Sequence, residues 1–522
     1  MTGAPSTPLL TVIALARSGA LDRARQLFRE AGLEAVTDDP ATLSVRGRLL
    51  KDEARRAPAA DRPALWREAG DAYARAAERS GTTYHLINAA TLALLAGDRR
   101  IAAERANRVL GKLDAGDTGP ETPYYLAATR AEALLLLGRT DEAEAALTQA
   151  VRLAPDAWED HASTLRQFVL VLDALKLDAA WLAALQPPRS LHFAGPLALV
   201  DDAGLRACID ALLADERIGF AYGALAGGAD LIVAEAVLAR GAELHLVLTA
   251  PPAIFRADSA APLGGDWPIR FDAVLEQAAT VSVVDTGVVA TTMLHVRLAA
   301  EVAMGKAVMN AAAIASEPVQ LLLVRTDTAS GATVEIGEHW RRTGRRQTIF
   351  NVPGAPEAAE RVKSLPESLD DEVLAAMLAV AIDGTLDCIA AALAETAPPM
   401  TSPVVGGGNV HLAFASPAEA ARAAGLIRRA MSGGEVRIAG HYGVVRLVTS
   451  PFGAERILIG STAGLAADML ASVPMGAIHL SEPFAAALNG WISLIAGETA
   501  YVGDLVRGAA SVGLYALTPA GR

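Results

Sequence analysis

Apolar positions recur at helical spacing through the first third of the chain. At Leu10, Ile13 and Ala14, for example, apolar residues fall three or four positions apart, which is the spacing of one helix face. Alanine, leucine, arginine and glutamate dominate residues 1–185, and runs of β-branched residues are few. The pattern predicts an all-helical region over residues 1–185.

A short turn recurs between the predicted helices at Gly19, Gly97 and Gly138, where a left-handed glycine can end one helix before the next begins. The segment 125–156, YLAATRAEALLLLGRTDEAEAALTQAVRLAPD, has small residues at the helix-packing positions and a closing Pro155. This segment resembles a tetratricopeptide repeat. Because one helix pair cannot bury its apolar face, such units stack into a solenoid. The resemblance implies a surface that binds a protein partner.

The pattern changes near residue 186, where short apolar runs begin to alternate with helical stretches. Alternation of this kind predicts a parallel sheet with helices on both faces, an α/β doubly wound domain over residues 188–345. The predicted strands are 191–195, 218–222, 243–248, 280–284 and 319–324, and the predicted helices are 205–213, 230–240 and 294–304.

A third pattern covers residues 346–522 and predicts an α+β domain with antiparallel pairing. Its longest apolar stretch carries Asp383 and Asp387, and central acids are expensive in a bilayer, so we expect a buried helix rather than a membrane span. The predicted elements are a helix over 370–395, a strand over 410–414, a helix over 417–432, a hairpin of 436–440 with 444–449, a helix over 463–472, a strand over 477–480 and a closing helix over 482–488.

Composition narrows the classes of function. The chain has 46 Lys and Arg against 59 Asp and Glu, so its formal net charge is 46 − 59 = −13. A chain this acidic has no general electrostatic reason to bind nucleic acid or an anionic membrane. Its two cysteines exclude a disulfide scaffold, and the first residues lack a signal-peptide pattern. We expect a cytoplasmic protein without membrane association.

Glycines and polar residues gather where the predicted parallel strands end, which is the edge at which open parallel sheets bind ligands. A glycine loop that opens a helix lets the backbone approach an anion, and this one lacks the G-x-G-x-x-G spacing of dinucleotide sites. Asp230 suits a helix N-cap or a ribose hydroxyl. The alternatives are that the glycines only form tight turns and that Glu235 lies on the exposed face of its helix. The candidate ligand-binding residues are Gly195, Gly223, Gly227, Gly228, Asp230, Glu235, Gly264, Gly265, Asp266, Trp267 and Arg270.

The segment AYGALAGGADLIVAEAVLARGAELHLVL and the later GGDWPIRFDAVL resemble the SLOG group of Rossmann-like domains, which are related to the cytokinin-activating LOG enzymes. The likeness covers about residues 188–345. It implies binding of a nucleotide or a nucleotide-derived ligand. The LOG motif PGG-x-GT-x-x-E has its nearest counterpart at Pro262–Trp267, which lacks the downstream Gly-Thr and glutamate. The resemblance therefore does not imply hydrolysis.

The last region resembles the class III adenylate/guanylate cyclase domain. That likeness covers roughly residues 345–490, and bacterial chains that join such a domain to tetratricopeptide repeats and a SLOG-like domain form a recognisable architecture. The matching positions are Arg437, His441, Gly443, Gly460, Ala466, Ala467, Gly476 and Ser481, after a 407–414 segment that matches the family's G-D-G-x-x-x-x-F.

Cyclase chemistry needs two metal-binding aspartates, an asparagine and an arginine. The resemblance places the first aspartate near Phe350–Val352 and the second on Gly408, neither of which is acidic; a shifted alignment reaches Asp370 or Asp371. It places the asparagine on Gly464 and the arginine on Asp468. The resemblance therefore implies a cyclase-like fold without the catalytic groups and without a metal. His411, His441 and His479 have no metal-ligand spacing, so we expect ordinary sheet or turn residues.

These observations favour a non-catalytic nucleotide-sensing or signalling scaffold that forms a homodimer, as class III cyclase domains do. Its helical repeats would bind a protein partner, and its middle domain a nucleotide-like ligand of unknown identity. One alternative is an enzyme that acts on a nucleotide through the SLOG-like domain, and another is an active cyclase. A pure scaffold without ligand is favoured if the glycine loops are collapsed and sealed by Trp267.

Overall fold

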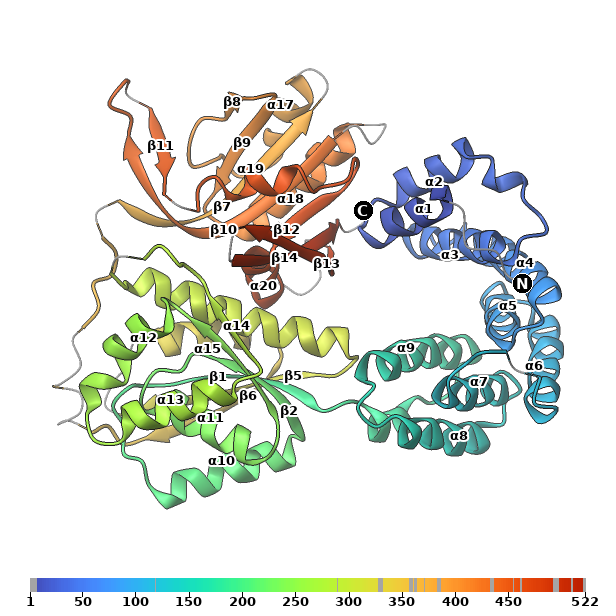
Figure 1. Cartoon of the computed structure of the whole chain (residues 1–522), viewed down its shortest axis with the longest axis horizontal. Coiled ribbons are helices and arrows are strands. Elements are labelled where there is room, and N and C mark those ends of the chain that lie inside the picture. The colour runs from blue at the N-terminus through green and yellow to red at the C-terminus, as the bar shows by residue number, and fades with distance from the viewer. Residues whose placement is uncertain are drawn as a thin grey trace. The chain divides into compact units, whose positions relative to one another are not determined.

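The computed structural model describes residues 7–117, 119–288, 290–326, 332–355, 360, 364–369, 371–382, 386–431, 436–453, 455–460, 462–491, 497–507 and 510–519. The chain divides into two compact units (Figure 1). The first is Met1–Pro187 with Ala313–Ala315, and the second is Pro188–Ala312 with Ser316–Arg522. Within the described ranges, the apolar helices are too short or too polar to cross a membrane.

The first unit is helical, as predicted, and its helices follow one another as antiparallel pairs (blue to teal in Figure 1). Gly19, Gly97 and Gly138 have positive φ values, which confirms that each turn uses a left-handed glycine. The helices are α1 (Thr7–Arg17), α2 (Leu21–Glu30), α3 (Pro40–Arg56), α4 (Arg62–Ser80), α5 (Thr83–Leu95), α6 (Arg99–Asp114), α7 (Pro123–Leu136), α8 (Thr140–Leu153) and α9 (Trp158–Leu175), with 3-10 turns η1 (Leu33–Ala35) and η2 (Ala180–Leu185).

A chain of polar side chains joins four helices of this unit. Glu132 on α7 accepts hydrogen bonds from Thr91 on α5 and, at 3.0 Å, from the Gln167 amide on α9. Lys51 on α3 donates to the same amide at 3.4 Å. Burial raises the pKa of Glu132 and lowers that of Lys51. The network ties alternate helices together at the spacing of the repeats, which explains why polar residues interrupt otherwise apolar faces.

The second unit contains a six-stranded sheet in which every pairing is parallel. The strand order is β4-β3-β2-β1-β5-β6, so the direction of winding reverses between β1 and β5. The strands are β1 (Arg189–Ala194), β2 (Ile218–Gly223), β3 (Glu243–Leu248), β4 (Thr280–Val283), β5 (Pro318–Arg325) and β6 (Arg346–Val352). The sheet includes β6 and so extends beyond residue 345, where we expected the middle region to end.

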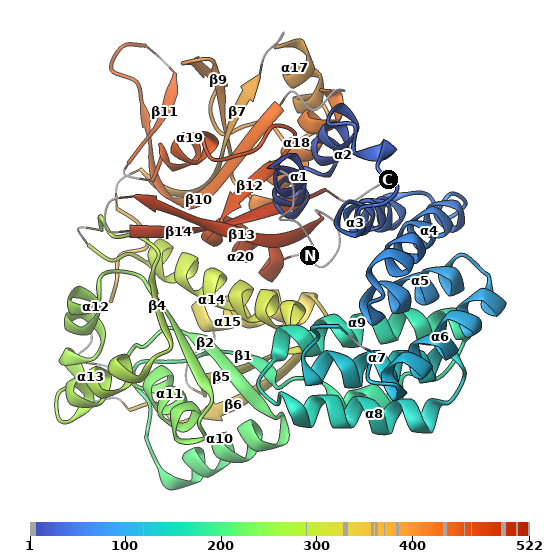
Figure 2. The ribbon, with the colours of Figure 1, turned by 45° about the vertical axis from the view of Figure 1, so that its right-hand side comes forward.

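Helices cover both faces of this sheet. In both ribbon views α10, α11 and α13 lie on one face, and α14 and α15 lie on the other (Figures 1 and 2). The core on the first face includes Ile209, Ile232, Leu246 and Phe271, all fully buried. The helices are α10 (Ala203–Asp215), α11 (Ala229–Ala239), α12 (Pro252–Ser259), η3 (Ala261–Leu263), α13 (Trp267–Gln277), α14 (Met293–Ala313) and α15 (Ala332–Arg342).

The rest of the second unit forms a separate, largely antiparallel sheet. Its strands follow the order β13-β14-β12-β10-β7-β9-β8, and β11 pairs with β10. The elements are β7 (Glu372–Ile382), α17 (Asp387–Leu393), β8 (Val404–Gly406), β9 (Asn409–Phe414), α18 (Pro417–Ala430), β10 (Val436–Thr449), β11 (Arg456–Ile459), α19 (Leu465–Leu470), β12 (Ile478–Ser481), α20 (Glu482–Trp491), β13 (Glu498–Arg507) and β14 (Ala510–Thr518).

The predicted helix over 370–395 is wrong in its first half, because Glu372–Ile382 forms the central strand β7. Alanine and leucine favour helices intrinsically, and a strand buried on both faces shows no alternation of apolar and polar residues. The predicted hairpin of 436–440 with 444–449 is also wrong. Residues 436–449 form one continuous strand, which pairs with β7 from Val436 to Arg446.

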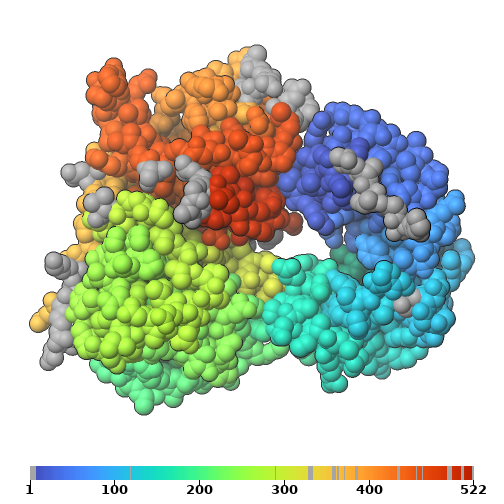
Figure 3. Space-filling model, viewed as in Figure 1, coloured from blue at the N-terminus to red at the C-terminus, as the bar shows by residue number. Residues whose placement is uncertain are grey.

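The closing helix is not the end of the fold, because β13 and β14 follow α20 and extend the sheet beyond β12. The helix α14 packs against this sheet as well as against its own. Leu298 and Val302 share a core with Val380 of β7 and Ile438 of β10. On the face shown in Figure 3, atoms of the two sheet regions, green and orange to red, meet along a common boundary.

Two contacts fix α14 against the antiparallel sheet. The Tyr442 hydroxyl on β10 donates a buried hydrogen bond of 3.0 Å to the Glu301 carboxylate. Gly305 lies so close to α20 that a Cβ atom would fall 1.9 Å from the carbonyl oxygen of Ala486. Because α14 packs against both sheets, the two sheets form one compact unit. The division of the chain into two units agrees, since both sheets belong to the second.

Candidate functional site

The structure brings the loops after β1 and β2 together at the carboxyl edge of the parallel sheet. The Ala229 N–H donates to the carbonyl of Pro196 at 3.0 Å, so the start of α11 lies against the loop that follows Gly195. The strand order reverses between β1 and β5, and such a reversal is where open parallel sheets bind ligands. Gly195, Gly227 and Gly228 therefore meet at the place predicted for a site.

The chain itself fills the space beside these glycines. A Cβ atom on Gly228 would lie 2.1 Å from the Leu197 carbonyl oxygen, and its φ of +74° is left-handed. A Cβ on Gly195 would lie 2.4 Å from Ala229, and one on Gly223 would lie 2.6 Å from the Phe193 ring. These glycines serve close packing of the protein against itself, which favours the tight-turn alternative.

The predicted second glycine loop covers the first. A Cβ atom on Gly227 would lie 2.2 Å from the Leu263 side chain and 3.2 Å from the carbonyl oxygen of Ser259. The loop is closed at this point by Leu263 rather than by Trp267. In contrast, Gly265 faces open space, and Asp266 beside it is exposed. Gly264 accepts a turn hydrogen bond from the Trp267 N–H, so it shapes the start of α13.

Asp230 lies under the glycine loop with only 6% of its surface exposed. Its Oδ2 atom accepts a 3.2 Å hydrogen bond from the Ala226 N–H, and its Oδ1 atom is buried without a hydrogen-bond partner among the described residues. Burial raises the pKa of Asp230 to about 7, although the N–H groups of Ala226 and Gly195 lower it. The chain's own carboxyl group therefore lies where these N–H groups would meet an anion.

Asp230 is not the N-cap of α11, because Gly228 occupies that position and makes no side-chain cap. The N-cap interpretation is therefore wrong. The carboxyl group turns back from the first helical turn toward the loop before it. A carboxyl with a near-neutral pKa is a feature of many active sites, yet here both oxygens are enclosed by the loop. The arrangement stabilises the loop as it stands.

Glu235, Trp267 and Arg270 come together on α11 and α13. Arg270 forms a two-pronged ion pair with Glu235 at 2.6 and 2.8 Å, and its guanidinium stacks over Trp267 at 4.2 Å. Arg206 and Asp201, which sequence reasoning missed, complete the network, since Arg206 binds both acids. Glu235 is thus paired rather than simply exposed. The four charges balance each other, so the network offers no net charge to a ligand.

The cyclase-like positions can be placed through the strand register. The β8–β9 hairpin turns at Gly407 and Gly408, which have positive φ values and no neighbours within 4 Å of a Cβ atom. Asn409 pairs with Ala381, so this turn lies near the carboxyl end of β7. Gly464 precedes α19, and Asp468 lies exposed on it. The turn carries no carboxylate where the resemblance expects the second metal ligand.

The position assigned to the first aspartate was wrong. Phe350–Val352 belongs to β6 of the parallel sheet, whereas β7 is the strand beside the hairpin. Asp371 precedes β7, at the opposite end from the hairpin turn, and Asp370 lies outside the described residues. The acid that follows β7 in the sequence is Asp383, which also lies outside them. His441 bonds to the Ser481 hydroxyl at 2.9 Å, and no cluster of metal-ligating side chains forms among the described residues.

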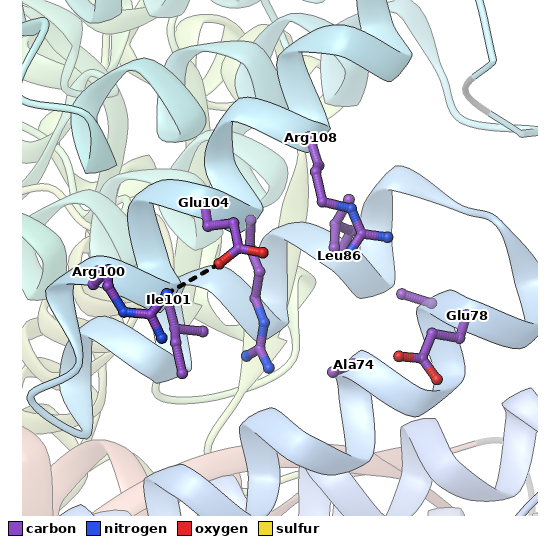
Figure 4. Close-up of a pocket in the computed structure, with 9 residues that line it drawn as sticks. Ala74, Glu78, Leu86, Arg100, Ile101, Glu104 and Arg108 are labelled. Atoms are coloured by element: carbon purple, nitrogen blue, oxygen red, sulfur yellow. Dashed lines mark hydrogen bonds and ion pairs between the residues drawn. The ribbon is translucent and has the colours of Figure 1, made fainter.

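A pocket in the first unit was not anticipated from the sequence. It has a volume of about 250 Å³ and lies where α4, α5 and α6 meet. Figure 4 shows Arg108 of α6 and Glu78 of α4 on opposite sides of the hollow, with Arg100 and Glu104 paired on α6. The sequence signal was present in RRIAAERANR, where Arg105 and Arg108 recur at the spacing of one helix face.

Comparison with known proteins adds one match at the level of sequence. Residues 9–93 match the family model described as Tetratricopeptide Repeats-Sensor. This match covers less than half of the chain and supports sensor-type tetratricopeptide repeats in the first unit. A search of curated protein sequences gives no match.

Solved structures similar to part of the chain include nucleotide cyclase domains. The guanylate cyclase domain of RhGC from Catenaria anguillulae in complex with GTP shares 16% identity over 29% of this chain and 99% of its own, with a TM-score of 0.24. The adenylate/guanylate cyclase/hydrolase from Silicibacter pomeroyi shares 20% identity over 29% and 99%, with a TM-score of 0.24. The adenylyl cyclase CyaB from P. aeruginosa shares 14% identity over 29% and 96%, with a TM-score of 0.22. At such scores the likeness carries no argument about function.

Proposed function

We propose that this chain is a non-catalytic signalling scaffold. The helical repeats bind a protein partner, the Rossmann-like, SLOG-like region around the parallel sheet binds a nucleotide-like ligand, and the cyclase-like region acts as a regulatory and dimerising module. The observation that carries the proposal is the β8–β9 turn. Two glycines without side chains stand where the resemblance requires a metal-binding carboxylate.

The electrostatics of metal-assisted phosphoryl transfer support this reading. Two divalent cations need carboxylates from two places, and one acid after β7 cannot replace both. Asp468 adds a negative charge on α19 where the resemblance expects an arginine that steadies the developing phosphoryl charge. The site would therefore lack a metal ligand and repel the triphosphate.

The nucleotide-like ligand is the finer part of the proposal. It is supported by the position of the glycine loop at the reversal of strand order. Because the chain fills the space at Gly195, Gly223, Gly227 and Gly228, we place the ligand beside the loop from Gly264 to Arg270, where Gly265 faces open space.

Thermal unfolding of the full chain against a panel of nucleotides, with and without magnesium, tests the ligand. Binding to the folded state at 100 times Kd adds about 2.7 kcal/mol of stability. We expect a shift that does not need magnesium and that Trp267→Ala reduces. Cys208→Ala should leave it unchanged, because Cys208 is exposed on α10, away from the loop from Gly264 to Arg270. No shift with any nucleotide would contradict ligand binding by the sheet and favour the scaffold without ligand.

The dimer is tested by the molar mass of the purified chain in solution. We expect twice the mass of one chain, because class III cyclase domains, which the last region resembles, work in pairs. A mass that stays that of one chain across the accessible concentration range would remove the dimerising role and leave the other parts of the proposal standing.

A further inference from the structure

The pocket of the first unit is lined by both apolar and charged side chains. Ala74 and Ala77 of α4, Leu86 of α5 and Ile101 of α6 supply the apolar surface. The charged side chains are those of Glu78, Arg100, Glu104, Arg105 and Arg108. An apolar surface beside a few charged groups is the usual composition of a recognition site.

Among the described residues, two of the three arginines form no ion pair with an acid. Arg100 pairs with Glu104 at 3.5 Å. Arg105 donates to the carbonyl oxygen of Ala89 at 2.8 Å, and neither it nor Arg108 forms an ion pair within the described ranges. Burial lowers the pKa of Arg105, the nearby carboxylate of Asp71 raises it, and the positive charge of Arg108 lowers it. The two guanidinium groups lie near each other and form no ion pair with a described residue, which favours an incoming anion.

The balance of charge and size defines the anion. Three arginines against two glutamates leave a formal charge of 3 − 2 = +1 on the lining residues. A single carboxylate matches that charge, whereas the several charges of a nucleotide triphosphate would meet Glu78 and Glu104. The volume of about 250 Å³ is also below the roughly 300–1,000 Å³ typical of sites for larger ligands.

We propose that this pocket binds an acidic side chain of a partner protein. A neighbouring aliphatic side chain of the same partner segment contacts the apolar residues of the lining. Arg105 and Arg108 bind the carboxylate, since a guanidinium and a carboxylate form the strongest protein hydrogen bonds. Ala77 and Ile101, which are both partly exposed, contact the aliphatic neighbour. This site rests on the proposed role of the repeats in partner binding and is independent of the ligand at the parallel sheet.

The test titrates the full chain with small probes and follows binding by calorimetry and by electron density in soaked crystals. The probes are 4-methylpentanoate, its neutral amide, inorganic phosphate, and the capped tripeptides Leu-Glu-Leu and Leu-Gln-Leu. We expect the Glu tripeptide to bind more tightly than 4-methylpentanoate, with its carboxylate against Arg105 and Arg108. The amide, the Gln tripeptide and phosphate should bind at least about tenfold more weakly.

Variants locate the binding. Arg108→Gln should weaken the Glu tripeptide at least about tenfold, because the exposed guanidinium supplies a charged hydrogen bond. Arg99→Gln is the matched control, since Arg99 is an exposed arginine of the same helix outside the pocket. Glu104→Gln should strengthen binding by removing a repelling charge. All three variants should keep the melting temperature of the parent.

Several outcomes would overturn the proposal. Binding of the Gln tripeptide or of the amide as tightly as the acids would remove the role of charge. Tighter binding of phosphate would assign the pocket to a phosphate group, and binding of 4-methylpentanoate without the tripeptide would assign it to a small acid rather than a protein. Unchanged binding in Arg108→Gln, or no carboxylate at the pocket under saturation, would also contradict it. A failed nucleotide panel would leave this result unaffected.

Discussion

The carboxyl edge of the parallel sheet and the pocket of the helical repeats differ in what occupies them. At the sheet edge, glycines, an acid and an ion-pair network stand where a ligand site is expected, yet the chain fills the space and pairs the charges. In the repeats the motif implies a partner-binding surface without naming a site, yet a pocket is present there, and Arg105 and Arg108 form no ion pair among the described residues. A glycine motif in the sequence shows where the backbone requires glycine. Open space and charges outside ion pairs show where a partner can bind.

The largest expected effect comes from filling the space at the glycine loop. Gly228→Ala should destabilise the parallel-sheet region by about 3 kcal/mol, because the new Cβ atom meets the Leu197 carbonyl and the left-handed φ adds strain. The matched control, Gly265→Ala, has a positive φ in open space and should cost only about 1 kcal/mol. Hydrogen exchange of peptides from β1 and α11 measures both. Equal effects would mean that the loop is open rather than packed.

The next effect is a dependence on pH through Asp230. Because its folded pKa of about 7 lies above its ordinary value of 3.8, the folded state holds a proton that the unfolded state has lost. Stability should therefore fall by about 3 kcal/mol as pH rises from about 5 to 8. Asp230→Asn should remove this loss, whereas the exposed Asp266→Asn should leave it unchanged. Urea unfolding at several pH values tests this, and an identical pH profile for Asp230→Asn would contradict the buried acid.

A smaller effect on stability distinguishes Arg270, which forms an ion pair, from Arg108, which forms none among the described residues. Arg270→Gln should cost about 1 kcal/mol, because it breaks a partly buried ion pair with Glu235 and the stacking on Trp267. Arg108→Gln should change stability by less than about 0.5 kcal/mol, since the side chain is exposed and forms no ion pair among the described residues. Melting temperatures compare the two. A larger loss for Arg108→Gln would mean that the pocket arginine is structural.

The sequence predicted the helical unit and the strands β1 to β5 because helical spacing and strand–helix alternation are local signals. It failed at β7, where Glu372–Ile382 combines helix-forming residues with burial on both faces, so that only pairing with β9 and β10 decides the structure. The same error moved the first expected metal ligand to Phe350–Val352, in the other sheet.

The two candidate sites could likewise be predicted only in part from the sequence. Glycine spacing located the loop before α11, since glycine is required by the backbone there. It could not show that Leu197, Leu263 and Phe193 fill the adjacent space, because these contacts come from other segments of the chain. The arginine pocket depends on how α4, α5 and α6 pack, and its only local trace is the spacing of the arginines on α6.

The central claim is that the cyclase-like region carries out no cyclisation. The most direct measurement is the incubation of the purified full chain with ATP or GTP and either magnesium or manganese, followed by quantification of cyclic nucleotides. We expect no product above the level without protein, because the β8–β9 turn offers no second carboxylate. Product formation that disappears in Asp383→Asn would contradict it and would identify an active cyclase built on a different set of ligands.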